Sequence, residues 1–272
     1  MVTQEQRRRQ LAREKFLRQQ QRRTEARRKA RVRNSVIASV LGVVLVGSVV
    51  SFAAGVFKND KKANAGAEVS PSASAPSKAP DPCQKPAEGK VKSLSWKNEP
   101  AMTIDTSAKY TMKLATTCGD IGIALKTDAA PHTVNSFNFL AGQGFFDHTK
   151  CHRLTTNGIY VLQCGDPKGT GTGGPGYTIP DENLKDASLK GNVYPAGTIA
   201  MANTGQKHTG GSQFFLVYQN SQLPPSYTPF GTVDAAGLAV LKKIAAAGES
   251  TGAGDGAPNA TVVINKATVT KS

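Results

Sequence analysis

The stretch that decides the fold is CHRLTTNGIYVLQCGDPKGTGTGG, residues 151–174. Apolar, β-branched and aromatic residues lie on both sides of a polar loop that ends at Gly158, which is the pattern of two strands joined by a turn. Arg153 lies in the first of these strands. Because an arginine keeps its charge, burying it costs several kcal/mol unless its N–H groups find partners. On this stretch alone, a salt-bridged or solvent-facing sheet arginine is the simpler interpretation.

Short apolar segments continue outward from this stretch through residues 101–272, so one domain with a full core is expected here. Seven or eight short strands with two helices indicate a closed or nearly closed antiparallel barrel with helices at its ends. Turn, proline and glycine signals predict strands at 110–116, 121–125, 198–203, 213–218, 230–233 and 261–270, and helices from Pro131 to Gly142 and over 238–247.

The N-terminal residues 1–33 are strongly basic. They hold 13 Lys and Arg against three Glu, so they account for most of the net charge of +15. This composition predicts a solvated basic helix or a disordered arm. Nucleic-acid binding is not expected, because aromatic residues are not interleaved with the charges.

Residues 34–57 contain no charged side chain. As a helix, residues 36–57 would span about 33 Å, which matches a bilayer core of about 30 Å. The basic flank predicts that the N-terminus stays in the cytoplasm and that everything after Phe57 lies outside the cell membrane. A signal peptide cleaved near Ala53 is the alternative, but the long charged flank favours an uncleaved single-pass anchor.

Residues 58–100 separate this segment from the domain. Their first part is rich in Ala, Ser and Pro, which predicts a flexible tether. The second part, from Cys83 to Pro100, is a transition segment in which Leu94 and Trp96 are expected to pack on the edge of the domain.

Several familiar sites are excluded by their surroundings. The glycines at 169, 171 and 174 fit the letters of a dinucleotide motif, but Pro175 follows where that motif needs a helix N-terminus. Ser212 lacks the spacing of a nucleophile elbow. The four cysteines and four histidines show no metal-ligand spacing. Neither a cofactor nor a metal is expected.

Polar residues interrupt otherwise apolar strands at four positions, Arg153, Gln163, Asn203 and Gln213. An apolar pocket with a few convergent polar groups binds a short, uncharged and partly hydrophobic ligand.

Five segments of the domain, in this order, resemble the successive motifs of cyclophilin-type peptidyl-prolyl isomerases. They are Cys151-His152-Arg153, Gln163-Cys164-Gly165-Asp166 with its glycine run, the segment 198–203, Gly211-Ser212-Gln213-Phe214-Phe215, and Phe230-Gly231. The resemblance covers about residues 105–272. It implies a mainly β fold, a closed eight-stranded antiparallel barrel capped by two α-helices, with the site on its outer face. It also implies proline-containing polypeptides as clients, and a monomer is expected.

The resemblance assigns roles residue by residue. Arg153 matches the catalytic arginine and Gln163 the glutamine that orients it. Tyr160 and Tyr227 stand where many members have Phe and His, and the segment between Arg153 and Gln163 is longer than in many members. The residues that the resemblance places around the substrate are Tyr160, Val161, Gly171, Ala202, Asn203, Gln213, Phe215, Leu223 and Tyr227.

Cysteines outside the membrane invite disulfides. Cys151 and Cys164 lie on the two strands of the proposed hairpin and could face each other, which would leave Cys83 to join the turn at Cys118. Free buried thiols are the alternative. The function expected is isomerisation of Xaa-Pro bonds in secreted or envelope proteins. The competing hypotheses are a tethered proline-peptide-binding module or chaperone without turnover, and a scaffold that acts through its basic arm.

Overall fold

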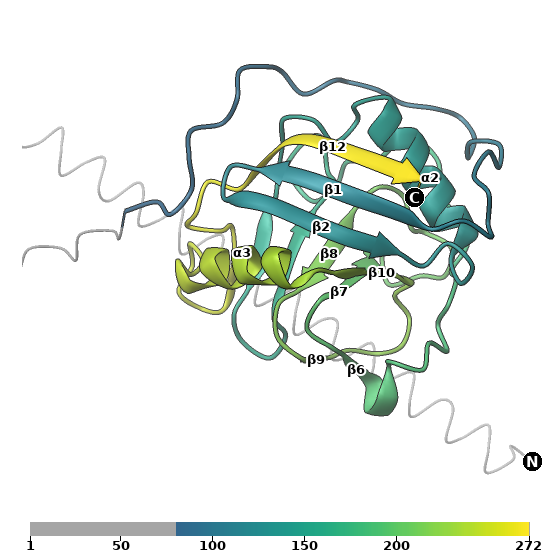
Figure 1. Ribbon diagram of the computed structural model, residues 1–272. Coiled ribbons are helices and arrows are strands. Elements are labelled where there is room, and N and C mark those ends of the chain that lie inside the picture. Colours follow the sequence, from purple (N-terminus) through teal and green to yellow (C-terminus); the bar gives the residue numbers. More distant parts are fainter. Residues whose placement is uncertain (1–79, 272) are drawn as a thin grey trace, which may run out of the picture. The chain divides into compact units, whose positions relative to one another are not determined.

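The structure is a computed structural model that describes residues 80–271 (Figure 1). The expected basic arm (1–33), the expected transmembrane helix (34–57) and the linker as far as residue 79 lie outside the described residues. Among residues 80–271, no helix combines the length and the apolar character that a membrane span requires.

A ten-stranded sheet dominates the described part of the chain, with strands in the order β11-β4-β5-β8-β7-β10-β2-β1-β12-β3. Adjacent strands of this sheet pair antiparallel throughout. A separate pair joins β6 to β9. The strands are β1 (Tyr110–Thr116), β2 (Gly119–Leu125), β3 (Thr149–Lys150), β4 (Arg153–Thr155), β5 (Val161–Cys164), β6 (Val193–Tyr194), β7 (Thr198–Met201), β8 (Phe214–Val217), β9 (Ser221–Gln222), β10 (Pro229–Val233), β11 (Asp255–Gly256) and β12 (Val263–Lys271).

The sheet curls until its two edge regions meet at one short segment. The Cys151 N–H donates to Val262 O, beside β12, and the next N–H, that of His152, donates to Gln163 O in β5. This segment breaks between β3 and β4, and β11 adds a further two-residue strand. The expected closed barrel of eight strands is therefore corrected to a curled sheet of ten.

Strand alternation divides the apolar residues of the sheet between two clusters. In β8, Phe214 and Leu216 face the interior, where they belong to the main core. Phe215 and Val217 face the other way and form a smaller outer cluster with Val161 of β5. Every residue of both clusters lies within residues 83–269, so the domain carries a complete core of its own.

Within residues 80–271, two α-helices lie at opposite ends of the sheet in Figure 1, α2 (Pro131–Gly142) and α3 (Ala235–Ala246). Pro131 opens α2 as its sequence predicts, because the first helical position needs no N–H donor. The carboxylate of Glu182 then accepts the free N–H groups of His132 and Thr133 at 3.0 and 2.8 Å. Asp234 caps α3 by accepting the Gly237 N–H at 2.6 Å.

The transition segment belongs to the folded unit. The ring of Trp96 packs against Phe139, with centroids 5.0 Å apart, and its backbone N–H donates to Pro175 O at 2.8 Å. A disulfide joins Cys83 to Cys118. The transition segment is therefore joined to residues 101–271 by an aromatic contact and a covalent link, as expected for Trp96.

A second disulfide joins Cys151 to Cys164. These are the two pairs expected from the sequence, and no cysteine in the described residues is free. Free thiols, the alternative, are thereby excluded.

Candidate active site

One row of cross-strand neighbours runs across four adjacent strands of the sheet. It consists of Arg153, Gln163, Phe215 and Ala200. Arg153 of β4 lies directly opposite Gln163 of β5. Gln163 lies opposite Phe215 of β8, and Phe215 lies opposite Ala200 of β7. Directly opposite residues project from the same face of a sheet. The strand register therefore brings a cation, an amide and an aromatic ring together on the outer face.

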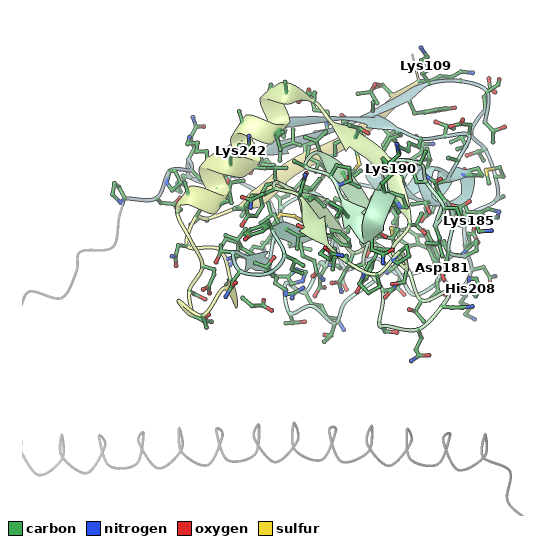
Figure 2. All side chains as sticks on the ribbon, turned by 90° about the horizontal axis from the view of Figure 1, so that it is seen from below. Lys109, Asp181, Lys185, Lys190, His208 and Lys242 are labelled. Atoms are coloured by element: carbon green, nitrogen blue, oxygen red, sulfur yellow. A yellow bond between two sulfur atoms is a disulfide. The ribbon has the colours of Figure 1, made fainter. Side chains whose placement is uncertain are left out.

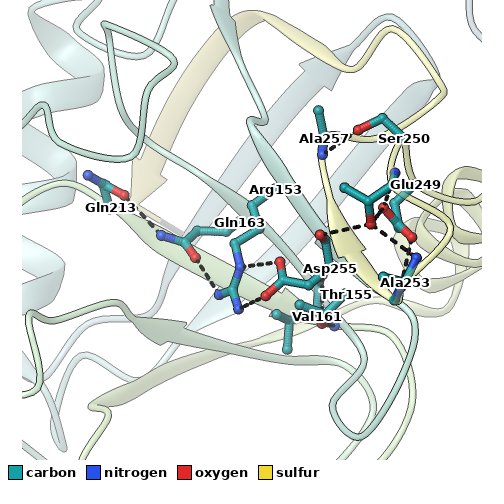
Figure 3. A network of polar contacts seen from close by, with 12 residues as sticks. Arg153, Thr155, Val161, Gln163, Gln213, Glu249, Ser250, Ala253, Asp255 and Ala257 are labelled. Carbon is teal, nitrogen blue, oxygen red and sulfur yellow. Dashed lines mark hydrogen bonds and ion pairs between the residues drawn. The ribbon is translucent and has the colours of Figure 1, made fainter. Parts of the chain in front are cut away.

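A chain of hydrogen bonds holds the polar end of this row (Figure 3). Arg153 Nη1 donates to Gln163 Oε1 at 3.2 Å, and Gln163 Nε2 donates to Gln213 Oε1 at 2.9 Å. Gln213 Nε2 donates in turn to Gly173 O at 2.9 Å. The glutamines thus connect the guanidinium to the glycine run, and each amide is oriented by the next partner in the chain.

Beside the arginine is a pocket of about 510 Å³ with an apolar floor. Phe215 and Val161, which are 5% and 2% exposed, form the floor, and Ile159 and Leu223 add apolar walls. A floor of this kind suits a compact apolar ring, and the arginine supplies hydrogen-bond donors at its edge.

Tyr160 does not line this pocket, contrary to the expectation. Ile159 takes that place, and the ring of Tyr160 packs edge-on against Tyr218 with centroids 5.9 Å apart. Side chains alternate along a strand, so residues 159, 161 and 163 share the outer face and Tyr160 points away from it. The segment between Arg153 and Gln163 is longer than in many members of the family that the sequence resembles, and this moves the aromatic residue one position along the strand.

The remaining predicted residues gather at the pocket rim. The ring of Tyr227 makes an edge-to-face contact with the ring of Phe215, and their centroids are 5.4 Å apart. Asn203 is held by its side-chain donation to Ser226 O at 2.8 Å. Gln213 lies in the neighbouring groove. The residues that line the pocket as expected are Val161, Gly171, Ala202, Asn203, Phe215, Leu223 and Tyr227.

The fully buried Tyr194 holds the backbone of Tyr227 at this rim. Its hydroxyl donates to Tyr227 O at 2.8 Å and accepts the Tyr227 N–H at 3.2 Å. Burial raises the pKa of Tyr194 to about 12, so the hydroxyl keeps its proton for this bond. The sequence contained no signal for this role, because Tyr194 lies in a Gly- and Pro-rich excursion.

The charge in the pocket comes from Arg153. The hydrogen bonds that Arg153 donates to the Asp255 carboxylate raise the pKa of the guanidinium, although burial opposes the shift. Burial lowers the pKa of the neighbouring His152, so that imidazole is neutral at pH 7. The pocket therefore offers one permanent cation beside a neutral imidazole.

A buried carboxylate, Asp166, organises the glycine run. Its two oxygens accept N–H groups from Lys168 at 2.7 Å, Thr170 at 2.9 Å, Gly171 at 2.6 Å and Thr172 at 3.1 Å. The side chain is fully buried. Burial alone would raise the pKa of Asp166, but these backbone donors lower it. The loop that lines the pocket at Gly171 is thus wrapped around one negative charge.

We expect Asp166→Asn to destabilise the domain by about 2 kcal/mol at pH 7, because an amide cannot accept all of these N–H groups. Since the pKa of Asp166 is lowered in the folded state, its contribution is complete above the unfolded pKa of about 3.9 and is lost as the pH falls through the folded pKa. Urea unfolding from pH 7 downward should show the difference between wild type and variant narrowing in acid. The exposed Asp128→Asn is the control. A difference independent of pH would contradict this account.

A wider groove of about 1010 Å³ adjoins the pocket. Gln163, Gly171, Ala202 and Asn203 line both hollows, so a bound chain can pass from one into the other. The transition segment contributes residues 97–99 to the far wall. The pocket and the groove thus form one continuous site.

The surface around the domain carries mixed charge. Residues 80–271 contain 17 Lys and Arg against 14 Asp and Glu. Lys109, Lys190 and Lys242 extend from separate parts of the surface in Figure 2. The basic excess of the chain therefore belongs mostly to the residues before this domain.

Comparison with known proteins agrees with this geometry. A family model described as "Cyclophilin type peptidyl-prolyl cis-trans isomerase/CLD" matches residues 111–269. Over 195 residues the chain is 51% identical to "Probable peptidyl-prolyl cis-trans isomerase B" of Mycobacterium leprae, covering 69% of this chain and 62% of that protein. Over 216 residues it is 45% identical to the protein of the same name from Mycobacterium tuberculosis, covering 76% and 65%.

A third relative matches a shorter stretch of the chain. "Peptidyl-prolyl cis-trans isomerase B" of Bacillus subtilis is 45% identical over 116 residues, covering 42% of this chain and 75% of that protein. The chain spans less than two thirds of the length of the two mycobacterial relatives.

Proposed function

Because the chain belongs to the family of cyclophilin-type peptidyl-prolyl cis-trans isomerases, we propose that its domain isomerises Xaa-Pro bonds, with Arg153 as the key hydrogen-bond donor. The observation that carries this proposal is the row in which Arg153, Gln163 and Phe215 are direct cross-strand neighbours. Phe215 and Val161 would receive the proline ring, and the arginine at the rim would then face the prolyl bond.

The reaction needs no nucleophile. Resonance flattens the Xaa-Pro amide, so rotation meets a barrier of about 18–20 kcal/mol. A donor directed at the prolyl nitrogen favours the twisted, pyramidal transition state over both planar ground states, which is differential binding. Millisecond turnover of a process that takes about 100 s requires about 7 kcal/mol. Arg153 would supply part of it, and the apolar floor and the oriented glutamine would add to it.

A binding module without turnover is the alternative, since an apolar pocket and a groove would also hold a proline segment. The two are separated by measuring exchange and affinity on one sample of residues 80–272, which carry their own core. Exchange spectroscopy of a peptide with one Xaa-Pro bond should show accelerated isomerisation. Binding of the peptide without acceleration would reject the enzyme and favour the binding module.

The clients and the location of the domain form the second part of the proposal. The apolar segment 34–57 and its basic flank support a single-pass anchor with the N-terminus in the cytoplasm. The isomerase domain would then meet secreted or envelope polypeptides as they fold. The two disulfides support this placement, because disulfides persist in oxidising compartments. Protease digestion of intact cells should remove the domain but leave the basic arm.

A further inference from the structure

We propose that Asp255 is a positioning residue for Arg153, a role that rests on the proposed function of this site. Asp255 Oδ1 and Oδ2 accept from Arg153 Nε and Nη2, each at 2.8 Å. Figure 3 shows the guanidinium between this carboxylate on one side and Gln163 on the other. Two parallel bonds to a planar fork fix the plane of the guanidinium as well as its position.

The contact leaves the arginine able to act on a substrate. A guanidinium has five N–H groups, and Asp255 and Gln163 together take three of them. One N–H then remains on each terminal nitrogen. Asp255 thus orients the group without exhausting its donors.

The strand register explains why Asp255 reaches the arginine. Asp255 of β11 lies directly opposite Thr155 of β4, which is two residues beyond Arg153. Arg153 and Thr155 share one face of the sheet, so Asp255 is the diagonal neighbour of the arginine on that face. An aspartate is short, and the arginine spans the remaining gap.

The loop that carries Asp255 is itself braced by a buried carboxylate. Glu249 is 7% exposed and accepts the Thr251 N–H at 2.6 Å and the Gly254 N–H at 2.8 Å. The Thr251 hydroxyl also donates to Asp255 O at 3.2 Å. The Thr156 N–H donates to Gly254 O at 2.9 Å, which joins the loop to the residue that follows β4. Figure 3 shows this network running from Glu249 to Gln213.

The pair is partly exposed, which limits the size of the effect. The side chains of Arg153 and Asp255 are 37% and 55% exposed, so water screens their attraction. Asp255 should therefore act by orienting the guanidinium of Arg153. We expect Asp255→Asn to lower kcat/KM by about fivefold and to change peptide affinity by less than about twofold. The reason is that a guanidinium without a fixed orientation loses its hydrogen bond to the substrate mainly in the transition state.

The matched control is Asp120→Asn. Asp120 pairs with Lys113 at 2.7 Å and is 58% exposed, but it does not line the pocket. This variant removes a surface ion pair of similar exposure and should leave kcat/KM unchanged. Asp255→Glu keeps the charge and should recover part of the lost activity.

A double-mutant cycle separates positioning from a general loss of structure. If Asp255 acts through Arg153, then Asp255→Asn should have no further effect on kcat/KM in an Arg153→Ala background. Equal losses in both backgrounds would overturn the proposal. Unchanged or increased activity of the single variant would also overturn it.

A spectroscopic measurement tests the contact without any turnover. Arg153 is the only arginine in residues 80–272, so its Nε–H gives a single side-chain signal in a ¹H–¹⁵N spectrum. That signal should exchange slowly with water in the wild type and rapidly in Asp255→Asn. Rapid exchange in the wild type would refute the fixed contact. If the wild type shows the slow signal but no isomerisation, the proposed function fails while the contact stands.

Discussion

Replacing Arg153 with lysine should lower kcat/KM for an Xaa-Pro peptide about 100-fold, which corresponds to about 2.7 kcal/mol of lost transition-state stabilisation. Lysine keeps the positive charge but lacks the planar fork. A single ammonium cannot contact Asp255 and Gln163 in the geometry seen here and still present fixed donors to the prolyl nitrogen. Exchange spectroscopy at several peptide concentrations would measure kcat and KM separately, and we expect the loss to fall on kcat.

Two further variants test whether the loss of activity comes from the donor geometry of Arg153. Arg153→Ala should lose at least as much as Arg153→Lys, because it removes the donors and the charge together. Lys150→Ala, an exposed change in β3, the strand that precedes β4 in the chain, should leave activity unchanged. If Arg153→Lys retained most of the activity, the charge alone would matter and the argument from donor geometry would be wrong.

The elements that sequence patterns predicted well are those with local signals. The strand at 110–116 has the predicted bounds, and helix α2 begins at Pro131 and ends at Gly142 as predicted. Proline at the first helical position and period-two alternation act over a few residues, so one sequence suffices to locate them. The second helix begins three residues before its predicted start at 238, where Asp234 supplies the cap.

The parts that were missed depend on register or on distant partners. Ile159 replaces Tyr160 in the pocket because one position along a strand reverses the face on which a side chain lies. Asp255 is 102 residues from Arg153 in the chain. It sits in a Gly-rich segment where no local pattern distinguishes a partner of an arginine from a solvated charge. Neither could be located without the pairing of β4 with β5 and β11.

Removal of the Cys151–Cys164 disulfide should affect both stability and activity. Replacing both cysteines with alanine releases a loop with a sequence separation of 13, and the loss of the cross-link should destabilise the domain by about 3 kcal/mol, as urea unfolding would measure. Cys151 lies two residues before Arg153, and Cys164 directly follows Gln163. Without the link, the two strands can shift relative to each other, and we expect kcat/KM to fall about fivefold.

The Cys83–Cys118 disulfide provides the matched control. Its sequence separation is 35, so its removal should destabilise the domain somewhat more, by about 4 kcal/mol. Neither Cys83 nor Cys118 lines the pocket or the groove, and activity measured below the unfolding transition should therefore be unchanged. Equal losses of activity in both double variants would mean that general stability, and not the alignment of β4 with β5, determines how well Arg153 is placed.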